Sequence, residues 1–155
     1  MYQPIYEPSV QPSLTPAITT EATEALKRSG FEMETLTPNR VTYRSGDRFV
    51  SIEIANSELS MRIGIGSSAG GASNSMRLDE MTHFMFGGLK RGCYSANELE
   101  LKQCLERAMK DLNEFAHDFL RGDFRPFLRI LAMKNREERE AAKAVDAKRA
   151  QVYLA

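Results

Sequence analysis

The sequence lacks an excess of charge of either sign. Its 155 residues include 21 basic and 21 acidic side chains, so the formal net charge is zero. Proteins that bind nucleic acids usually carry a basic excess, because their affinity depends on neutralising phosphates. A local basic patch aside, we therefore do not expect a nucleic-acid partner. Tryptophan is also absent, but 42% hydrophobic and 27% charged residues are ordinary for a globular protein of one domain.

Cysteine is scarce, and long apolar runs are missing. Cys93 and Cys104 belong to no CxxC or CxxH pattern, so we expect reduced thiols and no zinc site. No apolar run approaches the roughly 20 residues that span a bilayer. Residues 1–5 also lack the basic and apolar regions of a signal peptide. We therefore expect a cytoplasmic protein with no membrane partner, although a protein exported without a cleavable signal would share these features.

Proline spacing distinguishes the N-terminus. Pro4, Pro8, Pro12 and Pro16 fall at every fourth residue. This spacing prevents a helix and predicts an extended arm over residues 1–15. Such an arm either stays loose or docks its apolar residues on the body or on a partner.

Residues 16–133 are predicted to form a single α+β domain. Thr15 suits an N-cap, Pro16 suits the first helical position, and Gly30 suits the stop of a short helix. Alternating residues then predict strands, and the short turns between them predict antiparallel pairing. We expect an antiparallel meander of about four strands, with one buried face packed against a long amphipathic helix. The predicted strands are 31–36, 40–44, 49–54 and 59–65.

The rest of the chain is predicted to be mostly helical. The Gly- and Ser-rich residues 66–75 predict a flexible link, and a short helix follows that ends at Gly87. Ser95 and Glu98 match a capping box that opens the longest helix, residues 96–121. The apolar stripe of that helix has spacings of three and four and is expected to cover the sheet. Its members are Leu101, Leu105, Ala108, Leu112, Phe115 and Phe119.

The C-terminus is predicted to be a charged helical tail. Asp123 caps a further helix, and from residue 134 to residue 155 the composition turns to charged residues and alanine. Charged pairs such as Arg136 and Glu140 can support one another along a helix. We interpret this tail as a solvated helix; the alternative is a helix that binds a partner.

No catalytic, cofactor-binding or metal-binding residue is predicted. The glycines of the 66–75 link follow a strand, but no Lys-Ser or Lys-Thr follows them as a Walker A loop requires. His83 and His117 are the only histidines, and no local signature of a nucleophile accompanies either. Asp79 and Glu80 begin a helix, where their charge complements the helix dipole. We therefore predict that the protein is not an enzyme and needs no cofactor.

One stretch resembles known proteins. It reads Leu105-x6-Leu112-x2-Phe115-Ala116-x2-Phe119-Leu120-Arg121-Gly122-Asp123-Phe124-x2-Phe127. An amphipathic helix that ends in Leu-Arg-Gly-Asp, followed by an aromatic-led helix, resembles the C-terminal half of small bacterial proteins. Some similar proteins, built of a β-meander and helices, are immunity proteins of polymorphic or contact-dependent toxin systems. The resemblance covers about residues 99–131, implies a toxin as the partner, and identifies no binding residue.

The leading hypothesis is a non-catalytic cytoplasmic binding protein, an immunity protein that neutralises a bacterial toxin. The alternative is a secretion or assembly chaperone or adaptor that holds a segment of a secreted substrate, and a homodimer would favour it. A third class is an enzyme or nucleotide-binding protein that uses the 66–75 link. The elements expected to contact a partner are the link, the charged tail and the 87–94 loop with Lys90, Arg91 and Tyr94.

Overall fold

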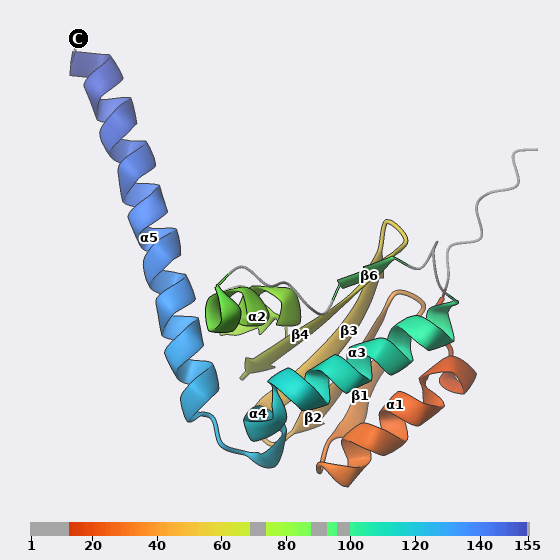
Figure 1. The fold of residues 1–155 in the computed structure, drawn as a ribbon. Helices are drawn as coiled ribbons and strands as arrows, with labels where there is room; N and C mark the ends of the chain where they lie inside the picture. Colours follow the sequence, from red (N-terminus) through yellow and green to blue (C-terminus); the bar gives the residue numbers. More distant parts are fainter. Residues whose placement is uncertain (1–12, 69–73, 88–92, 96–99, 155) are drawn as a thin grey trace, which may run out of the picture.

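The computed structural model describes residues 13–68, 74–87, 93–95 and 100–154. The architecture is α+β, as predicted: an antiparallel sheet packs against helices, and one long helix projects from the body (Figure 1). Most of the predicted N-terminal arm, residues 1–12, lies outside the described residues. In the described end of the arm, Leu14 is buried and its N–H donates to the carbonyl oxygen of Pro38 at 2.7 Å.

The described residues form a six-stranded sheet whose strand order starts β1-β2-β3-β4. Each of these four strands pairs antiparallel with the next, and all four predictions are confirmed to within one residue at each end. Two further strands pair with different stretches of β4. They were not predicted, because three residues are too few for alternation to be recognised. The strands are β1 (Glu32–Thr37), β2 (Arg40–Ser45), β3 (Arg48–Ala55), β4 (Glu58–Ile65), β5 (Ser75–Arg77) and β6 (Cys93–Ser95).

The Gly- and Ser-rich link joins two antiparallel strands, not a strand and a helix as the sequence suggested. The N–H of Ile65 donates to the carbonyl oxygen of Asn74 at 3.0 Å, and β5 pairs with β4 before the next helix begins. The side chain of Asn74 donates to the carbonyl oxygens of Ile65 and Ser67. The described ends of the link are therefore held by hydrogen bonds, while residues 69–73 lie outside the described part.

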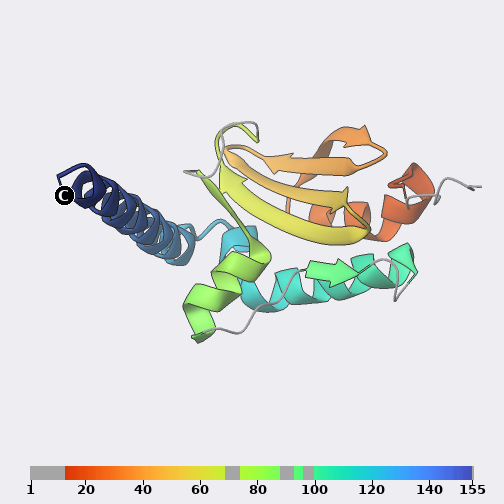
Figure 2. The same cartoon turned by 90° about the horizontal axis from the view of Figure 1, so that it is seen from above.

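One face of the sheet is buried under helices. The register aligns Val41, Ile52 and Met61 across three strands, and all three are fully buried. Two helices, α1 (Pro16–Arg28) and α3 (Leu101–Phe115), lie against this face, and α2 (Leu78–Phe86) follows β5 beside them (Figure 2). The start of α1 is as predicted: the Thr15 hydroxyl accepts a hydrogen bond from the N–H of Ile18 at 3.3 Å.

The prediction of one long helix over residues 96–121 is wrong. Helix α3 begins at Leu101 after Glu100, and a break at Ala116 (φ −118°, ψ 24°) separates it from α4 (His117–Arg121). Alanine favours helix, so no residue preference causes this break. A contact with a residue distant in the sequence holds the short helix that follows the break. Arg48 on β3 donates hydrogen bonds to the carbonyl oxygens of Phe119 and Leu120 on α4. The predicted capping box is wrong as well: Ser95 lies on β6, and the residue before α3 is Glu100. The predicted partner Glu98 lies outside the described residues.

The longest helix of the described chain is α5 (Arg125–Leu154), with 30 residues. At a rise of about 1.5 Å per residue it is about 45 Å long. The helix predicted after Asp123 and the charged tail predicted from residue 134 are thus one continuous helix. The predicted boundary between domain and tail falls inside α5.

Candidate protein-interaction surface

Helix α5 is anchored to the body at its N-terminal end. The carboxylate of Asp123 accepts hydrogen bonds from the guanidinium and the N–H of Arg125, and these hold the pKa of Asp123 below its usual value. Pro126 lies in the first turn, where its missing N–H leaves no helical hydrogen bond unmade. Phe127 is buried with its ring centroid 5.0 Å from that of Phe119 on α4. Ile130 and Leu131 are buried as well, so one face of the first two turns of α5 belongs to the core.

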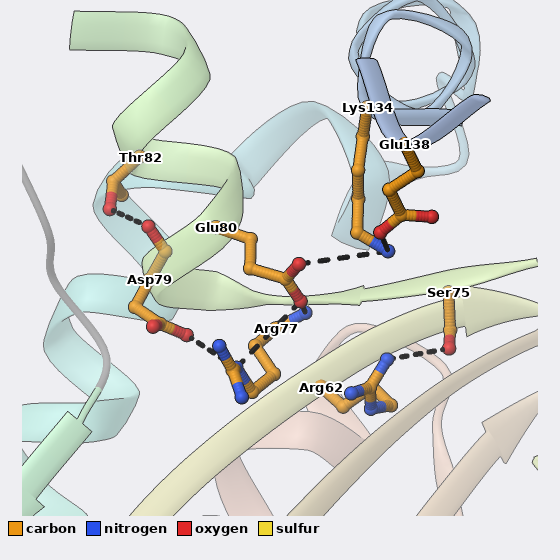
Figure 3. A network of polar contacts seen from close by, with 8 residues as sticks. All are labelled: Arg62, Ser75, Arg77, Asp79, Glu80, Thr82, Lys134 and Glu138. Atoms are coloured by element: carbon orange, nitrogen blue, oxygen red, sulfur yellow. Dashed lines mark hydrogen bonds and ion pairs between the residues drawn. The ribbon is translucent and has the colours of Figure 1, made fainter. Parts of the chain in front are cut away.

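An ion-pair network fixes α5 to α2 at the point where the helix leaves the body (Figure 3). The side chain of Lys134 is only 3% exposed, and its Nζ lies 3.6 Å from Oε2 of Glu80 and 3.4 Å from Oε1 of Glu138. On the other side of Glu80, the side chain of Arg77 pairs with Glu80 and with Asp79. The N–H of Arg77 also donates to Oε1 of Glu80 at 3.0 Å.

This network compensates for the burial of Lys134. An ammonium group taken out of water is costly unless carboxylates lie close to it, and two do so here. Removing either the lysine or Glu80 would leave a charge in this junction with fewer partners. The junction therefore stabilises one direction of α5 relative to α2.

Beyond the junction α5 projects away from the body. Every residue from 136 to 152 is exposed, and we call this range the projecting segment (Figure 1). It carries two sizeable exposed apolar side chains, Val145 at 50% and Val152 at 75%. These two residues lie beside Lys148 and Arg149 on the exposed part of the helix.

The face of α5 that docks on the body continues along the projecting segment. Positions spaced by three and four residues share one face of a helix. Starting from Phe127, that spacing passes through residues that are buried up to Lys134 and exposed after it. We call the exposed part the seam: Glu138, Ala141, Val145, Lys148 and Val152.

The three residues predicted from the sequence to bind a partner are only partly covered by the structure. Lys90 and Arg91 lie outside the described residues. Tyr94 lies on β6, is half-buried, and donates from its hydroxyl to the carboxylate of Asp111 on α3. A partner role for these residues stays a prediction, whereas the observed contact of Tyr94 joins β6 to α3.

The other chemically notable side chains are dispersed. His83 is exposed on α2 and His117 is exposed on α4. Cys104 is buried, and its Sγ lies 3.7 Å from the carbonyl oxygen of Ser95; burial raises the pKa of this thiol. Among the described residues, no three His, Cys, Asp or Glu side chains are grouped so that they could hold a metal ion.

The seam can be recognised in the sequence, but the junction cannot. Asp79 and Glu80 lie in the first turn of α2, as predicted, but the sequence indicates only an interaction with the helix dipole for them. Nothing local indicates that Glu80 contacts Lys134. The spacing from Phe127 to Val152, in contrast, can be read from the sequence; charged residues at three of its positions concealed it.

Although α5 is long, neither it nor any other helix among the described residues is apolar enough to cross a membrane. Comparison with family models, with curated proteins and with solved structures finds no match to this chain.

Proposed function

We propose that this chain is a non-catalytic, cytoplasmic protein-binding protein, and that the projecting segment of α5 is its recognition element. One observation carries the proposal: a single helix face is packed in the core at one end and exposed at the other. Helices commonly bind a partner by laying one exposed face, with its apolar side chains, against it. The junction at Lys134 supports this role, because it presents the segment in a defined direction.

The charge of the projecting segment favours a protein over a nucleic acid as partner. Basic and acidic side chains are interspersed along it: Arg136, Arg139 and Lys143 share one face, but Glu140 and Asp146 flank them, so the basic surface is short. Charges of both signs, on and around a face that also carries apolar side chains, are typical of a helix that pairs with another protein surface. The basic residues are Arg136, Arg139, Lys143, Lys148 and Arg149, and the acidic ones are Glu137, Glu138, Glu140 and Asp146.

Cytoplasmic location and the narrower roles belong to the same proposal. Two cysteines provide no disulfide framework of the kind that extracellular domains of this size often carry. An immunity protein would present the projecting segment to one toxin, whereas a chaperone or adaptor would use it to assemble or to hold a substrate segment. The partner recovered in the following experiment distinguishes these roles.

The test is a pull-down from lysate of the source organism with three tagged baits, followed by mass spectrometry. The first bait is the full chain, and the second carries Val145→Glu and Val152→Glu on the seam. The third carries Ala147→Glu and Ala150→Glu, which add the same charge on the opposite side of the same helix. Circular dichroism of each bait checks that the helix is retained.

We expect the full chain and the Ala147/Ala150 variant to retain the same stoichiometric protein, and the Val145/Val152 variant to lose it. A toxin in that position would support immunity, and a secreted substrate or a second copy of this chain would support the chaperone or adaptor. Retention by all three baits, or by none, would contradict the proposed role of the segment.

A further inference from the structure

We infer that the seam of α5 binds the seam of a second copy of this chain, with the two helices antiparallel. This inference rests on the proposed function, because it takes the projecting segment as the interaction element and names its occupant. Three features carry it: the order of side chains along the seam, their charges, and the point at which the body ends.

The spacing of the seam is that of a two-helix coiled coil. Its positions alternate steps of three and four residues, so they recur every 3.5 residues on average and keep facing a neighbouring helix. The same spacing includes Phe127, Leu131 and Lys134, which are buried in the body. The seam is therefore the continuation of an interface that already exists within the chain.

When two copies of the seam lie antiparallel, the charges of one copy complement those of the other. Counted along the chain, its first four residues are acidic, small, apolar and basic: Glu138, Ala141, Val145 and Lys148. In an antiparallel pair centred level with Lys143, Glu138 faces Lys148 of the second copy, and Ala141 faces Val145 of the second copy. Two-fold symmetry repeats both contacts, which gives four layers with two ion pairs outside and four apolar groups inside.

A parallel pair in register has no such complementarity. It would set Glu138 against Glu138 and Lys148 against Lys148, and like charges directly opposite one another are destabilising. The antiparallel arrangement removes both repulsions. It also turns the same four side chains into two attractive contacts.

The residues that flank the seam fit the same arrangement. Ala142 and Ala144 flank its centre, and their small side chains let two helix backbones approach closely. Farther out, the antiparallel pairing sets Glu137 beside Gln151 and Asn135 beside Arg149 of the second copy. No like charges meet at these flanking positions.

The body leaves room for this contact. Burial of α5 ends at Lys134, with Asn135 intermediate and every described residue from 136 to 152 exposed. Glu138 and Lys148 are ten residue steps apart, so this part of the seam is about 15 Å long. The second copy's Val152 would lie level with Lys134, beside the α2 junction, so the body itself limits the overlap. The two bodies would then lie at opposite ends of the helix pair.

Sedimentation equilibrium of the full chain over a wide concentration range tests the inference. We expect a reversible monomer–dimer equilibrium, because a contact of about three helical turns is at the small end of protein interfaces. Lys148→Glu sets two carboxylates against each other at both ends of the pair and should weaken the dimer by roughly tenfold or more. Lys143→Glu makes the same charge change on the outward side and should leave the dimer within about twofold.

A charge exchange tests the orientation. Glu138→Lys alone should also weaken self-association, since it sets two ammonium groups against each other at both ends. Combined with Lys148→Glu in one chain, it exchanges the two charges, and the antiparallel dimer should return to about the wild-type affinity. Melting curves confirm that Glu138→Lys, which alters a partner of Lys134, still folds.

Mixing this double variant with the wild-type chain separates the two orientations. In an antiparallel heterodimer like charges would meet at both ends, so we expect each chain to pair only with its own kind. In a parallel heterodimer every charged contact would be attractive, and the mixed pair would be preferred. Sedimentation of a mixture in which one chain carries a fluorescent label measures the difference.

Four results would overturn the inference. The first is a monomer up to about 0.5 mM, where contacts of Kd near 1 mM would already be populated. The others are equal effects of the Lys148 and Lys143 substitutions, no recovery in the double variant, or a preferred heterodimer on mixing.

The lysate experiment separates failure of this inference from failure of the proposed function. If the chain is monomeric but a different protein is lost with the Val145/Val152 variant, only the self-association is wrong.

Discussion

The ammonium of Lys134 on α5 lies 3.6 Å from the carboxylate of Glu80 on α2, and the lysine side chain is almost entirely shielded from solvent. This contact joins the helix that follows β5 to the helix that projects from the body. Glu80 is 23% exposed and Glu138 is 54% exposed, so the pair is screened on one side by water. The junction is thus intermediate between a surface ion pair and a fully buried one.

We expect Lys134→Ala to lower the free energy of unfolding by about 1–3 kcal/mol, because it removes a buried cation and leaves a small cavity. Lys134→Met fills the space without the charge and should cost less than Lys134→Ala. Urea denaturation followed by circular dichroism measures both. Lys143→Met, the same exchange at an exposed position, should stay within about 0.5 kcal/mol. Equal losses for Lys143→Met and Lys134→Met would contradict a structural role for the junction.

Among the basic residues of the sheet, Arg48 should be the one whose substitution lowers the free energy of unfolding most. Its guanidinium donates at 2.9 Å to the carbonyl oxygens of both Phe119 and Leu120 and lies over the rings of Phe31 and Phe124. We expect Arg48→Ala to cost about 2–4 kcal/mol, since it leaves the C-terminal carbonyls of α4 without these donors and removes two cation–π contacts.

Arg48→Lys separates the charge of this residue from its shape. Lysine keeps the positive charge but lacks the planar guanidinium with its several N–H donors. Arg48→Lys should therefore retain less than half of the stability that Arg48→Ala loses. Arg107→Ala, at an exposed position of α3, is the matched control and should be within about 0.5 kcal/mol of the wild type. Urea denaturation measures all three variants. Full recovery by lysine would show that charge alone matters at the end of α4.

The parts of the fold that were predicted correctly depend on local signals. Strands β1 to β4 were recognisable because side chains alternate and short turns separate them, and α1 because Thr15 and Pro16 start a helix. The break at Ala116 carries no local signal. The helix after the break is held by Arg48, which donates to the carbonyl oxygens of Phe119 and Leu120. These residues are 71 and 72 positions from Arg48 in the sequence.

The candidate surface was only partly predictable for a related reason. A run of charged residues is typical of a solvated helix, so the sequence places Lys134 in a solvated tail. Its burial depends on Glu80, which belongs to another helix. The seam follows the same three-and-four spacing that predicted the stripe of α3, but Glu138 and Lys148 interrupt its hydrophobicity. The charges of the seam complement those of a second copy only when the two helices are antiparallel. A pattern of apolar residues alone does not indicate this.

The phenol of Tyr43 should make stability depend on pH in the alkaline range. Tyr43 is fully buried with its hydroxyl 2.8 Å from that of Thr23, and burial raises the pKa of the phenol above its ordinary value near 10. A raised pKa in the folded state means that the stabilisation is complete below about pH 10 and is lost as the pH rises further.

Tyr43→Phe therefore should cost about 1 kcal/mol at pH 7 through the lost hydrogen bond, but should flatten the decline above pH 10. A single titrating group contributes up to about 1.4 kcal/mol per pH unit there. Urea denaturation of both proteins from pH 7 to pH 11 measures the two slopes. Parallel slopes would show that Tyr43 ionises as easily in the folded chain as in the unfolded one.

A side chain at position 64 on β4 should destabilise the protein, because the ring of Phe49 on β3 lies against Gly64. A Cβ at this position would lie 2.4 Å from Cζ of Phe49 and 2.6 Å from Cβ of Ser75, and Phe49 itself is buried. We expect Gly64→Ala to cost about 1–3 kcal/mol through overpacking, as measured by urea denaturation. Removing the ring with Phe49→Ala should relieve part of the clash, so the double variant should be more stable than the two single losses added together predict.

Gly46→Ala is the control for this coupling. No atom lies within 4 Å of its Cβ position, and its cost comes from the positive φ of 58°. Its loss should therefore add to that of Phe49→Ala without coupling, because the two substitutions share no contact. If the Gly64 and Phe49 losses also add without coupling, the ring does not constrain position 64.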